Sequence, residues 1–117
     1  MLAWTIYNKI GLRQTDESVR KGLNELFGFG IGYPIVGKMK IRTRTYYRTA
    51  YDEIKRCLRA GRIVHVDETR VNIKGGSGYV WVFTNLEEVL YVYAKSREGL
   101  VVSDVLGKFN GVLITDF

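Results

Sequence analysis

The chain has 117 residues, of which 46% are hydrophobic and 26% charged, so wholesale disorder is excluded and one domain, with or without a helical extension, is expected. No apolar run approaches the roughly 18 residues that a membrane span needs, and no secretory leader is recognisable at the start. Cys57 is the single cysteine, which excludes an intramolecular disulfide and a multi-cysteine zinc site. We therefore expect a cytoplasmic protein.

Positive charge is concentrated in the first half of the chain. Residues 1–60 carry 12 basic and 5 acidic residues, whereas residues 61–117 carry 6 basic and 7 acidic residues. The net charge of +6 therefore comes from the first half, and double-stranded DNA is the first anionic partner to consider. The alternative is that these charges only cover solvated helix faces.

Helical patterns fill the first half, which we treat as a basic helical region over residues 1–61. Polar residues at 15–18 predict the start of a helix that ends at Gly28, and a glycine-rich turn then leads to a second short helix from residue 35. This outline resembles a helix-turn-helix, although many helical hairpins share it. Residues 43–60 are the clearest helix, with one apolar stripe that we expect to pack in the core: Tyr47, Tyr51, Ile54 and Leu58.

A basic cluster lies between these two helical stretches, with tyrosines beside it. Its members are the candidate DNA-binding residues Lys38, Lys40, Arg42, Arg44 and Arg48. Closely spaced cations of this kind can hold the phosphate backbone of DNA. The alternative is a solvated linker.

The second part, residues 62–117, changes to a strand pattern. We expect strands in the run from residue 62 to 73 and at residues 79–84, 89–94 and 112–116, with a helix from residue 100 to 109 between the last two strands. Short loops, including a turn at residues 75–78, favour an antiparallel meander of the first three strands. The intervening helix permits a parallel fourth strand. The fold class is therefore α/β, with N-terminal helices followed by a mixed sheet.

Asp67 ends the β-branched run at residues 62–67, which residues 70–73 continue in strand-like fashion, and Asp116 ends the fourth strand, so we take both aspartates as strand ends. If those strands pair in parallel, Asp67 and Asp116 meet at one edge of the sheet. Neighbouring carboxylates repel unless a cation lies between them, and carboxylate oxygens suit Mg²⁺ or Mn²⁺. The alternative is that both are ordinary strand-end residues. By alternation Glu68 faces the other side, where we expect a structural role, while the lone His65 shares the face of Asp67 and is expected to be a packed or surface residue.

The order of short motifs in this second part resembles a known protein family. The motifs are His65-Val66-Asp67-Glu68-Thr69, Tyr79-Val80-Trp81-Val82, Ser96-Arg97 and Gly111-Val112-Leu113-Ile114-Thr115-Asp116. They are similar to the catalytic core of insertion-sequence transposases of the DDE type, which has a ribonuclease-H-like fold. The resemblance covers residues 62–117 closely and the preceding helices more weakly.

The resemblance implies DNA transposition with a divalent metal, Mg²⁺ or Mn²⁺. Asp67 and Asp116 would be the first two acids of the catalytic, metal-binding triad, and the third acid, a glutamate on a later helix, has no counterpart in the sequence. The polypeptide alone is therefore expected to be inactive, as a fragment or a degenerate element. The alternatives are a non-catalytic DNA-binding remnant and an unrelated small α/β module.

An apolar edge strand at residues 112–116 also predicts self-association as a homo-oligomer.

Overall fold

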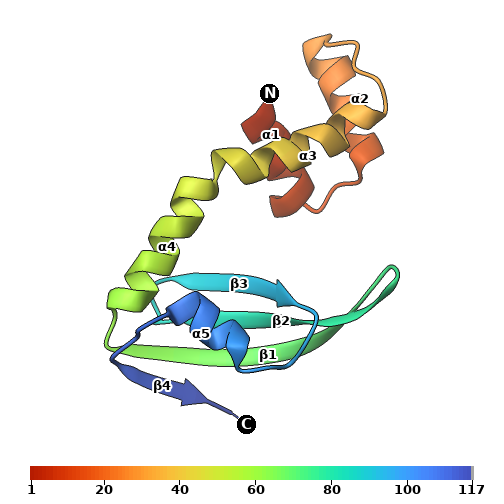
Figure 1. Ribbon diagram of the computed structural model, residues 1–117. Helices are drawn as coiled ribbons and strands as arrows, with labels where there is room; N and C mark the ends of the chain where they lie inside the picture. The colour runs from red at the N-terminus through yellow and green to blue at the C-terminus, as the bar shows by residue number, and fades with distance from the viewer. Residues whose placement is uncertain (117) are drawn as a thin grey trace. The chain divides into compact units, whose positions relative to one another are not determined.

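The computed structural model describes residues 1–116, which form two compact units, Met1–Arg48 and a second unit from Thr49 onward. Figure 1 shows helices in the first part of the chain and a sheet with its covering helices in the second. None of the helices formed by residues 1–116 is both long and apolar enough to cross a membrane. Each unit is described by itself.

The first unit consists of short helices around a small core. Helix α1 (Leu2–Ile6) continues into a π-helical turn, η1 (Tyr7–Gly11), and is followed by α2 (Asp16–Phe27) and α3 (Pro34–Tyr46). The buried hydrophobic cluster of this unit consists of Val19 and Leu23 of α2 and Val36 of α3. Trp4 and Ile31 pack against this cluster. Burial of these few apolar residues is what holds the short helices together.

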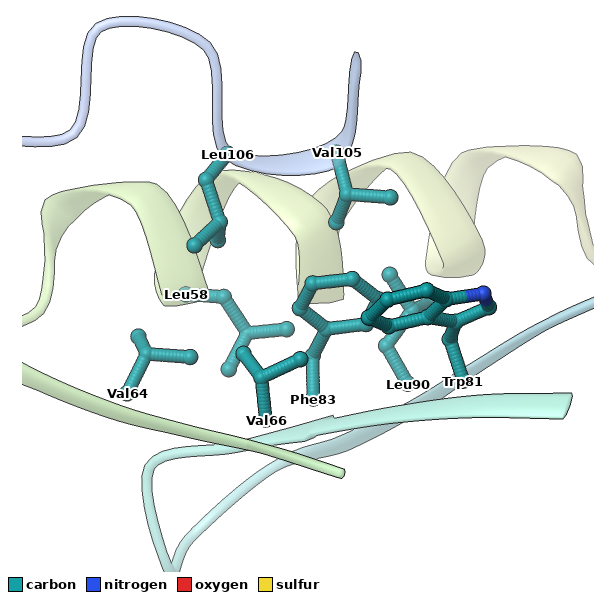
Figure 2. Packing of buried hydrophobic residues seen from close by; sticks show 8 residues of the cluster. All are labelled: Leu58, Val64, Val66, Trp81, Phe83, Leu90, Val105 and Leu106. Atoms are coloured by element: carbon teal, nitrogen blue, oxygen red, sulfur yellow. The ribbon is translucent and has the colours of Figure 1, made fainter. Parts of the chain in front are cut away.

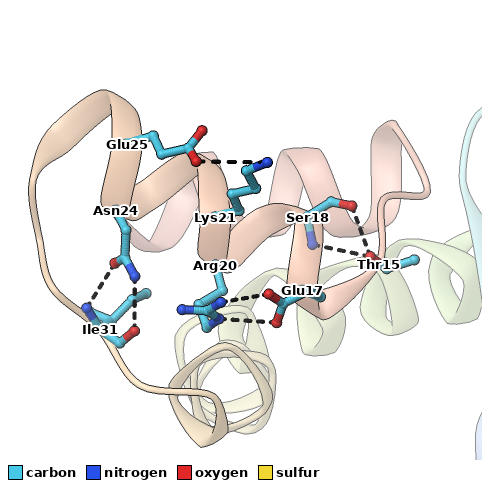
Figure 3. A network of polar contacts seen from close by, with 8 residues as sticks. All are labelled: Thr15, Glu17, Ser18, Arg20, Lys21, Asn24, Glu25 and Ile31. Carbon is cyan, nitrogen blue, oxygen red and sulfur yellow. Dashed lines mark hydrogen bonds and ion pairs between the residues drawn. The ribbon is translucent and has the colours of Figure 1, made fainter.

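Local polar contacts set the limits of α2 (Figure 3). The hydroxyl of Thr15 accepts a hydrogen bond from the backbone N–H of Ser18 at 3.1 Å, which caps the helix as the sequence predicts. Gly28 ends the helix with a φ of +66°, a conformation that glycine adopts without strain. The guanidinium of Arg20 hydrogen-bonds the Glu17 carboxylate and thereby holds the pKa of that carboxyl below its ordinary value.

The second unit contains a four-stranded mixed sheet. After α4 (Arg48–Ala60) come β1 (Ile63–Ile73), β2 (Gly76–Thr84), β3 (Val89–Ala94), α5 (Leu100–Leu106) and β4 (Val112–Thr115). The strand order is β3-β2-β1-β4, with β1 antiparallel to β2, β2 antiparallel to β3, and β1 parallel to β4. The predicted α/β class, the meander and the parallel fourth strand are therefore confirmed.

One face of this sheet carries the core of the second unit (Figure 2). The buried cluster joins residues of β1, β2 and β3 to residues of α4 and α5: Leu58, Val64, Val66, Trp81, Phe83, Leu90, Val105 and Leu106. The rings of Trp81 and Phe83 stack with centroids 6.5 Å apart. Because side chains alternate along a strand, the residues between these, including His65 and Asp67, lie on the opposite face.

Three local predictions were wrong. The basic cluster from Lys38 to Arg44 lies within one helix, α3, rather than between two helical stretches, because the chain remains helical to Tyr46; the alternative of a linker is therefore also excluded for these residues. The predicted apolar stripe of α4 is shorter than expected: Ile54 and Leu58 pack in the core, whereas Tyr47 and Tyr51 are exposed. The β1–β2 turn is also tighter than predicted, since Ile73 already pairs with Gly76.

Gly111 allows β4 to approach β1 closely. A Cβ at this position would overlap the Arg62 carbonyl oxygen and the Phe109 ring. We therefore expect Gly111→Ala to destabilise the chain by about 1–3 kcal/mol, as overpacking commonly does. Gly99→Ala is the control, because a Cβ there meets nothing within 4 Å and the position is not in the left-handed region. Urea unfolding of both variants measures the difference, and equal free energies of unfolding would contradict this account.

Strand β4 forms one edge of the sheet formed by the described residues and exposes apolar side chains. Val112, Leu113 and Ile114 are 58%, 41% and 44% exposed. An apolar edge without Lys or Pro favours pairing with another strand, so we expect concentration-dependent self-association. Ile114→Lys should weaken it at least several-fold in sedimentation experiments. Ile73→Lys, at an equally exposed isoleucine of the β1 hairpin, is the control, and a wild-type chain that remains monomeric would refute the expectation.

Candidate active site and DNA-binding surface

The parallel pairing of β1 with β4 places the two predicted aspartates side by side. His65 is aligned with Ile114 and Val66 with Thr115, so the next step of the register aligns Asp67 with Asp116, just after the last residue of β4. Neighbouring strands lie about 4.8 Å apart, and aligned residues of parallel neighbours face the same side of the sheet. The predicted parallel pairing of these two strands is therefore confirmed. The prediction that Asp67 ends the first strand is wrong, because β1 continues to Ile73 in its ladder with β2.

An open hollow surrounds this pair of aspartates. It is lined by residues of β1, β2 and the end of β4: His65, Val66, Asp67, Val82, Thr84, Ile114, Thr115 and Asp116. Most of these positions lie on the sheet face opposite the buried cluster, as the alternation of β1 requires. Asp67 and Asp116 are both exposed, so both are accessible to solvent.

Asp67, Glu68 and His65 make different contacts in the structure. Asp67 is exposed, and its Oδ1 accepts a hydrogen bond from the backbone N–H of Glu68 at 2.8 Å. Glu68 points to the other side of the sheet, where its carboxylate forms an ion pair with Arg97. His65 lies on the Asp67 side and helps to line the hollow. Arg97 is therefore the residue with which Glu68 forms the structural contact that we expected.

The donor set of this site suits a hard cation only in part. Two carboxylates in adjacent positions offer the oxygen ligands that Mg²⁺ prefers, and Mg²⁺ usually retains several water ligands. Residues 1–116 contain no group of three or more His, Cys, Asp or Glu side chains that could hold a metal ion. Asp67 and Asp116 are therefore the residues that would hold a magnesium ion at this site, through their carboxylates.

Four of the predicted DNA-binding residues lie on α3, where they form two groups on different sides of the helix. Because residues four apart lie on one side of a helix, Lys38 and Arg42 form one pair and Lys40 and Arg44 another. Val36 and Met39 are buried between the two flanks. The four cations make no ion pair within residues 1–116, so their charge is not neutralised by the chain there. Arg48, the fifth predicted residue, begins the next helix, α4.

The Lys38 and Arg42 flank borders an apolar hollow within the first unit. Its lining combines these two cations with the N-terminus and one face of α3: Met1, Leu2, Ile35, Lys38, Met39, Arg42 and Tyr46. Tyr46 is 72% exposed, so an aromatic ring and two cations share one accessible surface. From the sequence, the five basic residues were taken as one cluster because they are close together in the chain. A helical period applied to residues 38–44 would have placed Lys38 and Arg42 on one side of the helix and Lys40 and Arg44 on another.

Comparison with known proteins identifies the family of this chain. A family model described as Transposase IS66 family matches residues 1–117, the whole of the sequence. A search of the curated proteins and a search of the solved structures each found no match. The family match covers both the basic helices and the sheet that carries Asp67 and Asp116. The chain therefore belongs to the IS66 family of transposases.

Proposed function

We propose that this chain supplies two metal-binding carboxylates of a DDE-type transposase centre with a ribonuclease-H-like sheet. The observation that carries the proposal is the parallel alignment of β1 with β4, which aligns Asp67, within β1, with Asp116, just past the end of β4, on the same face of the sheet. Two like charges so placed favour a divalent cation between them. Membership of a transposase family makes DNA the substrate.

The proposed reaction is phosphodiester cleavage followed by strand transfer. Water attacks a DNA phosphate, the bond from phosphorus to the 3′ oxygen breaks, and the departing oxygen takes up a proton to leave a 3′-hydroxyl. That hydroxyl then attacks a phosphate of the target DNA and displaces its 3′ oxygen in turn. A magnesium ion, when bound, supplies Lewis acidity at the phosphate and at the attacking oxygen. Asp67 and Asp116 hold it by their carboxylates, while the open hollow admits the scissile phosphate.

The DNA backbone is held by α3 in this proposal. Lys38, Lys40, Arg42 and Arg44 carry charge that no acidic residue of the described chain neutralises. Unpaired cations gain most from phosphate contacts, because binding releases condensed counterions from DNA. Such contacts position the duplex without reading its sequence. A cytoplasmic location, where the DNA of the cell is accessible, is consistent with this role.

A second candidate is a DNA-binding chain that does not cleave DNA. One observation favours it: within residues 1–116 no third metal-ligating side chain joins Asp67 and Asp116. Such a chain would occupy DNA through α3 and would have no metal-dependent activity by itself. The alternative of an unrelated small α/β module is not retained, because the family match spans the chain.

Manganese binding tests the metal site directly. We expect the chain to bind Mn²⁺ weakly, as measured by the relaxation rate of water protons, and Asp67→Asn or Asp116→Asn to weaken binding by on the order of tenfold through loss of one charge. Asp104→Asn, an exposed acid on α5, is the control and should leave binding unchanged. DNA binding without manganese binding would favour the second candidate over the first.

Salt dependence tests the DNA-binding surface. The slope of log affinity against log salt should flatten by roughly 2 in Lys38→Ala/Arg42→Ala if both residues contact phosphate, since each contact contributes about 0.9. The matched variant Lys40→Ala/Arg44→Ala examines the other flank of α3. Lys74→Ala/Lys108→Ala removes the same charge from exposed positions of the sheet unit and should change the slope little. An unchanged slope in both α3 variants would show that these cations are only a solvated surface.

A further inference from the structure

Glu68 combines burial with an ion pair directly beside the proposed metal site. Its side chain is only 4% exposed, although the preceding residue, Asp67, is exposed. Its carboxylate pairs with Arg97, which lies 29 residues later in the segment between β3 and α5. Carboxylates are rarely buried unless they are paired. The charge of Glu68 therefore depends on an arginine from a different part of the sheet unit.

Arg97 is the partner on which Glu68 relies. The cross-strand neighbour of Glu68 is Trp81, whose indole N–H is buried without an acceptor among the described residues. Trp81 therefore fills space beside Glu68 but does not hydrogen-bond it. No second cation within residues 1–116 forms an ion pair with the Glu68 carboxylate. Removal of Arg97 would leave a buried carboxylate without compensation.

The backbone of Glu68 links this ion pair to Asp67. The Glu68 N–H donates to Asp67 Oδ1 at 2.8 Å, so the amide that orients the Asp67 carboxylate belongs to the residue that Arg97 anchors. Side chains of successive residues point to opposite faces of the strand. An anchor on the core side can therefore fix the carboxylate on the open side without entering the hollow.

We infer that the Glu68–Arg97 ion pair is a positioning device for Asp67. Arg97 holds Glu68 against the helix-covered face, the Glu68 amide holds Asp67 Oδ1, and Asp67 is thereby kept beside Asp116. The inference rests on the proposed function only in taking this pair of aspartates as the metal site. Neither Glu68 nor Arg97 contacts the metal in this account. Partners that orient metal ligands in this indirect way commonly change metal affinity by about 10–100-fold.

The sign of the effect distinguishes positioning from simple electrostatics. Loss of the positive charge of Arg97 should by Coulomb's law alone strengthen cation binding at the aspartates. Positioning predicts the opposite, because a released Glu68 no longer holds Asp67 in place. We therefore expect Arg97→Gln to weaken Mn²⁺ binding by about tenfold. Arg97→Lys, which keeps the charge, should recover most of the affinity, and Arg56→Gln, which breaks the exposed pair with Glu53 on α4, should have no effect.

Hydrogen exchange of the Glu68 amide provides a second readout that needs no metal. In the folded 117-residue chain, Arg97→Gln should speed exchange of this amide by on the order of tenfold, while amides of β2 and β3 remain protected in both proteins. Unchanged exchange at Glu68, or Mn²⁺ binding that is equal or tighter in Arg97→Gln, would overturn the inference. If the wild-type chain binds no Mn²⁺, the proposed metal site fails, and the exchange rate alone then decides the inference.

Discussion

The parallel pairing of β1 with β4 is the constraint on which the candidate site depends. A parallel neighbour cannot be reached by a tight turn, so the chain must cross over the sheet, and here α5 makes that crossing. Val105 and Leu106 of α5 are buried against the sheet, which ties the crossover to the same core as β1. Gly111 then lets the chain pass close to the Arg62 carbonyl as β4 begins. These contacts together set where Asp116 lies.

This arrangement concentrates negative charge at one edge of the sheet. Asp67 and Asp116 are aligned and exposed, so water and salt reduce their repulsion in the absence of a cation. The third acid nearby, Glu68, is kept from adding to that charge because it faces the core side and pairs with Arg97. Strand β1 thus presents the carboxylate of Asp67 to the open hollow, while the carboxylate of the next residue, Glu68, is neutralised by Arg97. This separation by alternate faces is what makes the pair of aspartates a defined site.

The first unit differs from the second in that one of its helices exposes unpaired positive charge. Helix α3 buries only a narrow stripe, Val36 and Met39, and leaves cations on both flanks. On α2, by contrast, Arg20 and Lys21 are paired with Glu17 and Glu25 (Figure 3). Two neighbouring helices therefore differ in how much positive charge they offer to an anionic partner. The unpaired set on α3 is the one suited to phosphate.

The elements of the second unit and their order could be predicted from the sequence by itself. Alternating and β-branched runs, together with short turns, led to the correct order of strands and helix, and the aspartates were found because each follows a β-branched run. Asp67 does not end its strand, since β1 continues to Ile73. These features are local, and local patterns report directly on the backbone conformation. The limits of α3 and the exposure of Tyr47 and Tyr51 were not predictable in this way, because they depend on which neighbours are available to bury each residue. Tertiary structure alone paired Glu68 with Arg97, since residues 29 apart meet only when β1 and the segment before α5 are brought together by the sheet.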